Sequence, residues 1–274
     1  MTIEQQCNEM LKKYLQSAEK EYGKLPQHCY ETKIEFFTNE ENKNESHHAD
    51  TFRNVLMINK NHTKEIEWII YHEMEHIRTA KEIGKSALGG VRVIPYPDNS
   101  GNVQFDSANE ALTDMSVEKL LGRKDTKVGY YETIQLTRQI GALLGFENDS
   151  QILAYYRIGG YEDLKSLVEK TFKDENSFLL MQIYLDKLHE FHIKDIAEEF
   201  NKFGKIKNKP LGSITSENTY RFRKTLRDYI FALLNKLKET NQISNKEYEK
   251  RLTNMEKLSP YNNNELNTEE VLGV

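Results

Sequence analysis

The stretch His72-Glu73-Met74-Glu75-His76 decides most of what the sequence indicates about this chain. Two histidines four residues apart project the same way from a helix, so both imidazoles can reach one metal ion. A glutamate directly after the first histidine can act as a general base on a water molecule at that ion. The pattern therefore predicts metal ligands at His72 and His76 and a general base at Glu73.

The sequence around the motif is typical of a helix with one buried face. Its apolar residues recur at intervals of three and four: Ile66, Ile69, Ile70, Met74 and Ile77. At about 100° per residue, the two histidines and Glu73 fall at the edge of this apolar arc. Lys64, Glu75 and Arg78 fall on the opposite face. We therefore expect the motif to face the interior or the wall of a cleft, with a chance match in a charged chain as the alternative.

A second helix is predicted downstream, with Ser107 as its N-cap and Gly122 at its end. In this helix Glu110 and Asp114 are four residues apart and share one face. One carboxylate can complete a zinc site, and the other can accept the spare N–H of a metal-bound histidine and so fix its tautomer. The alternative for Glu110 is a capping box with Ser107, in which the glutamate bonds only to the backbone of its own helix.

Together, His72-Glu73-x-x-His76 and Asn109-Glu110-x-x-Thr113-Asp114 resemble the paired motifs of the gluzincins, the thermolysin-like zinc metallopeptidases. The resemblance covers residues 30 to 125 or so, and the small size of this region looks more like the minigluzincins than the large secreted enzymes. It implies that His72, His76 and Glu110 bind Zn²⁺, that Glu73 is the general base, and that Asp114 is the partner of His72. The implied reaction is zinc-dependent hydrolysis of a peptide bond, as limited processing of a peptide or protein.

Neither motif indicates the residue that would stabilise the oxyanion. Gluzincins often place a tyrosine shortly before the ligand glutamate, or a histidine further on, and this chain has no tyrosine in the ten residues before Glu110. The remaining candidates are Tyr130, Tyr131, His189 and His192. We expect Tyr131 to take this catalytic role, with an ordinary packing or surface role as the alternative for each candidate.

The periodicity predicts an α+β protein that is predominantly helical. Residues 1–125 would form a zincin-like lobe, with a small, mostly antiparallel sheet and the two zinc-site helices. Helical periodicity dominates from Val128 onward and predicts an all-helical lobe over 126–258. A disordered tail rich in Asn and Glu is expected over 259–274. The helical lobe would be either a wall of the cleft or a module that binds a partner.

Individual strands are expected at Lys33–Phe37, at Val55–Ile58, and in a hairpin of Val91–Ile94 with Val103–Phe105. Ala49–Phe52 would be either the sheet edge to which a peptide adds itself, as the gluzincin resemblance implies, or a plain loop. Helices other than the two zinc-site helices are expected at 4–20, 129–144, 150–157, 162–172, 177–203, 216–240 and 248–257.

Composition limits the classes of partner. The chain has 274 residues and a net charge of −5, which allows a sizeable core and gives no reason to expect a nucleic acid or an anionic membrane as partner. No apolar stretch approaches the length of a membrane span, and the first residues lack signal-peptide character. Cys7 and Cys29 form no metal-type pair, and nothing requires a disulfide. We therefore expect a cytoplasmic protein that acts on a peptide or protein substrate; its oligomeric state is left open.

Two other hypotheses fit the same sequence. A catalytically inactive zinc-binding protein, whose helical lobe binds a partner, would hold its metal in closed coordination by four protein ligands. The motifs offer three ligands, which favours an enzyme. A helical scaffold with an accidental motif would bind no metal at all.

Overall fold

The computed structural model describes residues 1–38, 47–61, 65–83, 86–90, 92–95, 106–123, 130–203 and 216–257. Within them the chain is predominantly helical and carries two small three-stranded sheets, so the expected α+β class with a majority of helix is confirmed. The tail expected over 259–274 lies outside the described residues.

The chain divides into two compact units. The first unit consists of Met1–Gln104, Thr113–Lys124 and Tyr155–Glu162. The second consists of Phe105–Leu112, Asp125–Ala154 and Asp163–Val274. The sequence placed a single boundary at residue 125, and so it anticipated neither the return of residues 155–162 to the first unit nor the grouping of 105–112 with the second.

The first sheet has the strand order β1-β3-β2. Its strands are β1 (Lys33–Phe37), β2 (His48–Asp50) and β3 (Val55–Asn59). The central strand β3 pairs parallel to β1 and antiparallel to β2. Its near-continuous apolar run is typical of a strand that is covered on both faces, and Val55, Leu56 and Ile58 are all buried. The sequence predicted β1 and β3 to within one residue.

The edge strand β2 decides between the two alternatives for Ala49–Phe52. Ala49 and Asp50 belong to the strand, with Ala49 opposite Leu56 of β3, whereas Thr51 and Phe52 lie in the turn that follows. Among the described residues, β2 is paired along one edge only.

A second sheet follows directly after the helix that carries the motif. It consists of β4 (Ala80–Ile83), β5 (Ser86–Gly89) and β6 (Arg92–Pro95), paired antiparallel in that order. The sequence expected the third of these strands to pair with Val103–Phe105, but residues 96–105 lie outside the described part of the chain, and the partner of β6 within it is β5. The strands β4 and β5 were missed because their sequences, Ala-Lys-Glu-Ile and Ser-Ala-Leu-Gly, are only four residues long and do not alternate between apolar and polar residues.

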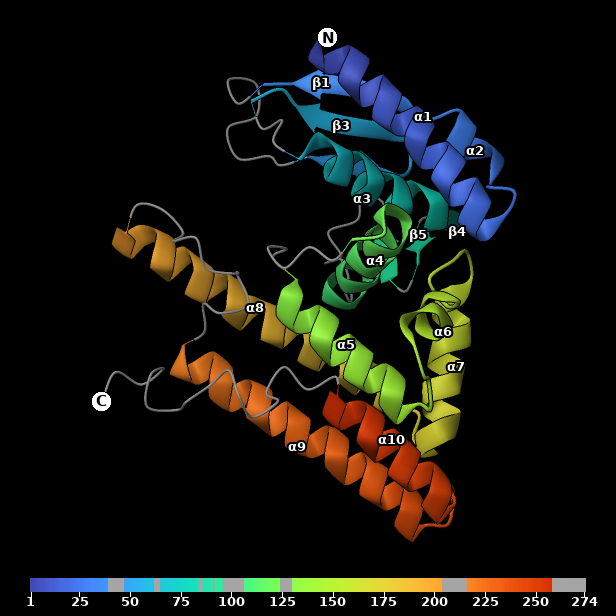
Figure 1. Ribbon diagram of the computed structural model, residues 1–274, viewed down its shortest axis with the longest axis vertical. Coiled ribbons are helices and arrows are strands. Elements are labelled where there is room, and N and C mark those ends of the chain that lie inside the picture. The colour runs from blue at the N-terminus through green and yellow to red at the C-terminus, as the bar shows by residue number, and fades with distance from the viewer. Residues whose placement is uncertain are drawn as a thin grey trace. The chain divides into compact units, whose positions relative to one another are not determined.

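Two long helices of the first unit pack against each other, and Figure 1 shows them near the first sheet. They are α1 (Ile3–Tyr22) and α3 (Ile66–Thr79), and the short helix α2 (Gln27–Tyr30) lies between them in the chain. A capping box starts α1, because the Thr2 side chain accepts from the Gln5 N–H and the Gln5 side chain accepts from the Thr2 N–H. The rings of Tyr14 on α1 and Tyr71 on α3 meet edge to face, with centroids 5.3 Å apart.

One continuous helix, α4 (Asp106–Leu121), carries the second motif. It ends where the sequence predicted, because Gly122 adopts a left-handed φ of 65°. The Arg123 N–H then donates to the carbonyl of Glu118, which satisfies a carbonyl at the helix end.

The second unit is built from helices. They are α5 (Tyr131–Leu143), α6 (Asp149–Leu153), most of α7 (Gly160–Phe172), α8 (Ser177–Phe203), α9 (Glu217–Glu239) and α10 (Asn245–Lys257). Helices α5, α8, α9 and α10 pack on one another (Figure 1). Leu143 on α5, Leu188 on α8 and Leu234 on α9 are fully buried. None of the described helices combines the length and the apolar character that a membrane crossing requires.

Candidate metal centre

The two motif histidines lie on one face of α3 with their side chains in contact. Their Nε2 atoms are 3.2 Å apart, and their ring planes are inclined at 79°. Two nitrogens that each lie about 2.0–2.1 Å from a tetrahedral zinc ion are about 3.3 Å apart, so this spacing fits a shared metal. The same distance also allows a direct hydrogen bond between the two rings. The residues around His72 and His76 indicate which of the two arrangements, a shared metal ion or a hydrogen bond, is favoured.

Asp114 orients the first of these rings. The Nδ1 atom of His72 donates to Oδ1 of Asp114 across 2.7 Å, and Asp114 is 2% exposed. Because the proton is held on Nδ1, the lone pair of His72 is left on Nε2, which faces His76. This is the tautomer that a metal ligand needs.

Glu110 completes the cluster. The candidate ligand atoms of His72, His76 and Glu110 all lie within 4.8 Å of one another. Glu110 is one helical turn before Asp114 on α4, so the bond from Asp114 to His72 brings this part of α4 close to the ring pair. Two imidazoles and a carboxylate are a donor set that suits zinc, and other divalent metals of the first transition row accept it as well.

The capping-box alternative for Glu110 loses its basis in the structure. Ser107 lies inside α4 rather than ahead of it. Its backbone N–H donates to Oδ1 of Asp186 on α8, at 2.9 Å, so a carboxylate from another helix satisfies the start of α4.

Several carboxylate and imidazole side chains are buried where the motif on α3 meets α4. Glu73, His76, Glu110 and Asp114 are all less than 9% exposed. Removing so many ionisable groups from water is costly unless they have hydrogen-bond partners or a shared cation. A bound cation would offset that cost.

Glu75 and Arg78, which the periodicity places opposite the apolar arc, are nevertheless buried. Lys64, expected on the same face, lies outside the described residues. Glu75 is 0% and Arg78 is 7% exposed, and they form a two-pronged ion pair with N–O distances of 2.9 and 2.5 Å. Burial raises the pKa of Glu75, but the Arg78 charge and the hydrogen bonds outweigh burial and hold that pKa below its ordinary value. The periodicity misplaced both residues because it treats charge as a sign of solvent, although a paired charge can be buried.

The four candidates for stabilising the oxyanion lie at the start of α5 and on α8. Tyr131 is the first residue of α5, and its side chain is outside the described part, so its catalytic role stays a prediction. The ring of Tyr130 stacks on His189, with centroids 4.4 Å apart and planes inclined at 15°. His192 is 1% exposed, and burial, with a smaller contribution from His189, lowers its pKa to about 4. Tyr130, His189 and His192 all belong to the second unit.

No family model, no curated protein and no solved structure matches this chain.

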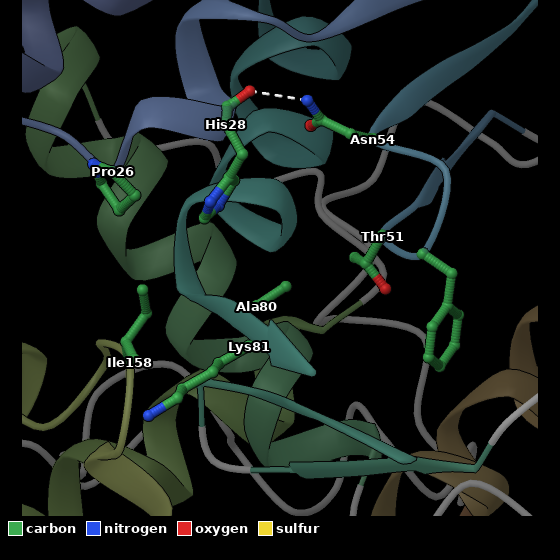
Figure 2. Close-up of a pocket in the computed structure, with 8 residues that line it drawn as sticks. Pro26, His28, Thr51, Asn54, Ala80, Lys81 and Ile158 are labelled. Atoms are coloured by element: carbon green, nitrogen blue, oxygen red, sulfur yellow. Dashed lines mark hydrogen bonds between the residues drawn. The ribbon is translucent and has the colours of Figure 1, made fainter. Parts of the chain in front are cut away.

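A cavity of about 460 Å³ lies elsewhere in the first unit, beside the end of α3. Its lining residues are Pro26, His28, Thr51, Phe52, Asn54, Ala80, Lys81 and Ile158. Figure 2 shows the Asn54 amide donating to the backbone carbonyl of His28, at 2.6 Å, and the His28 ring in turn donates to the carbonyl of Ile77 at 2.9 Å. None of the metal-cluster residues lines this cavity, so it is a separate feature.

Proposed function

We propose that the chain is a zinc-dependent peptidase of the gluzincin type, with a zincin-like lobe that contains α3 and α4. The observation that carries the proposal is the approach of Glu110 to both His72 and His76, with Asp114 bonded to the far side of the His72 ring. A chance His-Glu-x-x-His pattern gives no reason for a separate helix to supply both a third ligand and the partner of a ligand.

The chain's own residues would divide the chemistry between them. A zinc ion in this cluster would supply a water molecule with a pKa of about 7 and would polarise the substrate carbonyl. The carboxylate of Glu73, next to His72 on α3, takes a proton from the attacking water and later gives it to the leaving amine. Asp114 holds the proton on Nδ1 of His72, so that Nε2 stays free to act as a ligand atom.

The edge strand β2 supports a peptide as the substrate class. An extended peptide can add itself to a sheet edge through main-chain hydrogen bonds, and among the described residues β2 offers such an edge. Limited processing of a peptide or protein is the reaction that we infer.

The rival hypothesis of an inactive zinc-binding protein calls for a different coordination. Structural zinc sites are closed by four protein ligands, whereas catalytic sites have three and keep one position open. Among the described residues the cluster has three candidate ligands, which favours the peptidase.

The test compares the wild-type chain with Glu73→Gln, which retains the shape of the side chain but cannot act as a base. Zinc content is measured by atomic emission, and hydrolysis is measured on a quenched-fluorescent peptide library with and without a chelator. We expect Glu73→Gln to keep its zinc and to lose activity by roughly 10²-fold or more, the contribution of a general base. Glu67→Gln is the matched control, because Glu67 is on the same helix but is only half-buried and lies outside the motif.

Full hydrolysis by Glu73→Gln would remove Glu73 from the mechanism. A wild-type chain that takes up no zinc would rule out the peptidase and the inactive zinc-binding protein together. Zinc uptake without hydrolysis of any library peptide would favour the inactive zinc-binding protein.

A further inference from the structure

We infer that Glu75 and Ser116 are positioning residues, which fix α4 against α3 so that Glu110 meets the two motif histidines. The inference rests on the metal site of the proposed function and adds the device that places its third ligand. It depends on hydrogen bonds around the carboxylate of Glu75, the fourth residue of the motif.

Both oxygens of this carboxylate are fully used. Oε1 accepts from the Tyr14 hydroxyl at 2.7 Å and from Nε of Arg78 at 2.9 Å. Oε2 accepts from the Ser116 hydroxyl at 2.5 Å and from Nη2 of Arg78 at 2.5 Å. Because the single proton of Ser116 points at Glu75, the Tyr22 hydroxyl donates in its 2.6 Å bond to Ser116. One carboxylate on α3 is thus bonded to hydroxyls from both α1 and α4.

The hydrogen bonds between α3 and α4 include two that lie within one turn of each helix. His72 is bonded to Asp114, and Glu75 to Ser116, so the anchors are three residues apart on α3 and two apart on α4. One such bond leaves α4 able to pivot about it, whereas two bonds fix its rotation. Glu110 is one turn from Asp114, so its distance from the imidazoles depends on that rotation.

Tyr156 adds two further hydrogen bonds to this network, one to Arg78 of α3 and one to Thr113 of α4. Its backbone carbonyl accepts from Nη2 of Arg78 at 3.3 Å, and its hydroxyl is 2.5 Å from the hydroxyl of Thr113. Thr113 directly precedes Asp114 on α4. Glu75, Thr113, Ser116 and Tyr156 are all at most 1% exposed, so water cannot readily replace any of these bonds.

A matched pair of variants separates positioning from general stability. Tyr14→Phe and Ser116→Ala each remove one hydroxyl bonded to Glu75, but only Ser116 lies on α4. Zinc affinity of the full chain is measured by competition with a chromophoric chelator, after circular dichroism and urea unfolding have confirmed that each variant is folded. We expect Ser116→Ala to weaken zinc binding by roughly 10- to 100-fold, as the loss of outer-shell support does, and Tyr14→Phe to change it by less than about threefold.

A double-mutant cycle tests whether Ser116 acts through Glu110. In a chain that carries Glu110→Gln the third ligand is already lost, so adding Ser116→Ala should weaken zinc binding no further. A loss that simply adds to that of Glu110→Gln would mean a general loosening of the fold, and it would overturn the inference.

The outcomes also separate this inference from the proposed function. If the wild type binds zinc and Ser116→Ala binds it equally tightly, the positioning role is overturned and the metal site stands. A wild type that binds no zinc overturns both. Peptide hydrolysis does not enter the measurement, so a chain that binds zinc but cleaves no peptide still supports the inference when Ser116→Ala weakens binding selectively.

Discussion

Glu75 is a charged residue that is completely buried, and its role depends on the residues that bind it. On α3 it lies between His72 and His76, the candidate ligands, yet it faces α1 and α4 and pairs with Arg78. The two adjacent glutamates of the motif thus have different surroundings: Glu73 lies beside His72 in the helix, and Glu75 is held by four hydrogen bonds. A buried carboxylate with all of its hydrogen bonds satisfied stabilises one arrangement of the helices around it.

Removing one member of this ion pair should be costly. We expect Arg78→Met to lower the free energy of unfolding by about 3–5 kcal/mol, because Glu75 is then left buried without its cation. The measurement is urea unfolding at neutral pH. The double variant Glu75→Met with Arg78→Met should recover part of the loss, since neither charge remains. A loss below about 1 kcal/mol in Arg78→Met would show that water reaches Glu75 and replaces the pair.

At the scale of the elements, helix ends show where local chemistry is sufficient. Ser216 caps α9, because its side chain accepts from the Thr219 N–H, and the helix starts at the next residue. Asp195 of α8 binds the backbone N–H of Ser216 at 2.8 Å and so ties the two helices together. The sequence predicted the bounds of α8 and located α9 to within one residue because such caps and the 3.6-residue period are local signals.

The C-terminal end of α4 depends on the backbone of one glycine. Gly122 has a φ of 65°, and an added Cβ would meet no atom within 4 Å, so an alanine there would be strained but would not clash. We expect Gly122→Ala to lower the free energy of unfolding by about 1 kcal/mol. Gly141, inside α5, is the control: its added Cβ would lie 3.5 Å from Phe146 and 3.6 Å from Ile152, ordinary contact distances.

Gly141→Ala should therefore raise the free energy of unfolding, by up to about 1 kcal/mol, because alanine favours a helix interior over glycine. Urea unfolding of both variants gives the comparison. Equal effects of the two substitutions would mean that the left-handed φ at residue 122 does not set the stability of the helix end.

For the whole molecule, the buried His192 makes stability depend on pH. Its pKa is lowered to about 4 by burial and, less strongly, by His189, with Asp195 acting in the opposite direction. An unfolded histidine has a pKa of about 6.5. Between pH 6.5 and 4 the unfolded chain therefore binds a proton at this histidine, whereas the folded chain does not. The free energy of unfolding falls as the pH drops through this range, by up to about 3 kcal/mol. Above pH 6.5 this residue contributes no pH dependence.

The measurement is the free energy of unfolding in urea between pH 4 and pH 8, for the wild type and for His192→Gln. The difference between the two curves isolates His192 from Glu132, whose pKa is raised by burial against the opposing charge of Arg223 and whose contribution is lost as the pH rises. Curves that stay parallel below pH 6.5 would contradict the assignment, because they would show that another group causes the acid dependence.

The sequence by itself determined the long helices, the strands β1 and β3, and the residue types of the candidate site. Helical periodicity, caps and the left-handed Gly122 depend on neighbours a few residues away, and so does the shared face of His72 and His76. The apolar residues that mark β1 and β3 were an equally local signal. The weakly patterned strands β4 and β5 were missed, because short strands of this kind depend on their partners in the sheet.

Only the tertiary structure decided which of these residues meet. Glu110 had a local alternative in the capping box, and its approach to the imidazoles depends on how α4 packs on α3. The burial of Glu75 and Arg78 could not be read from their own helix either, since α1 and α4 cover a face that periodicity assigns to solvent. Contacts between residues far apart in the chain are set by packing and by satisfied hydrogen bonds, and a local pattern contains neither.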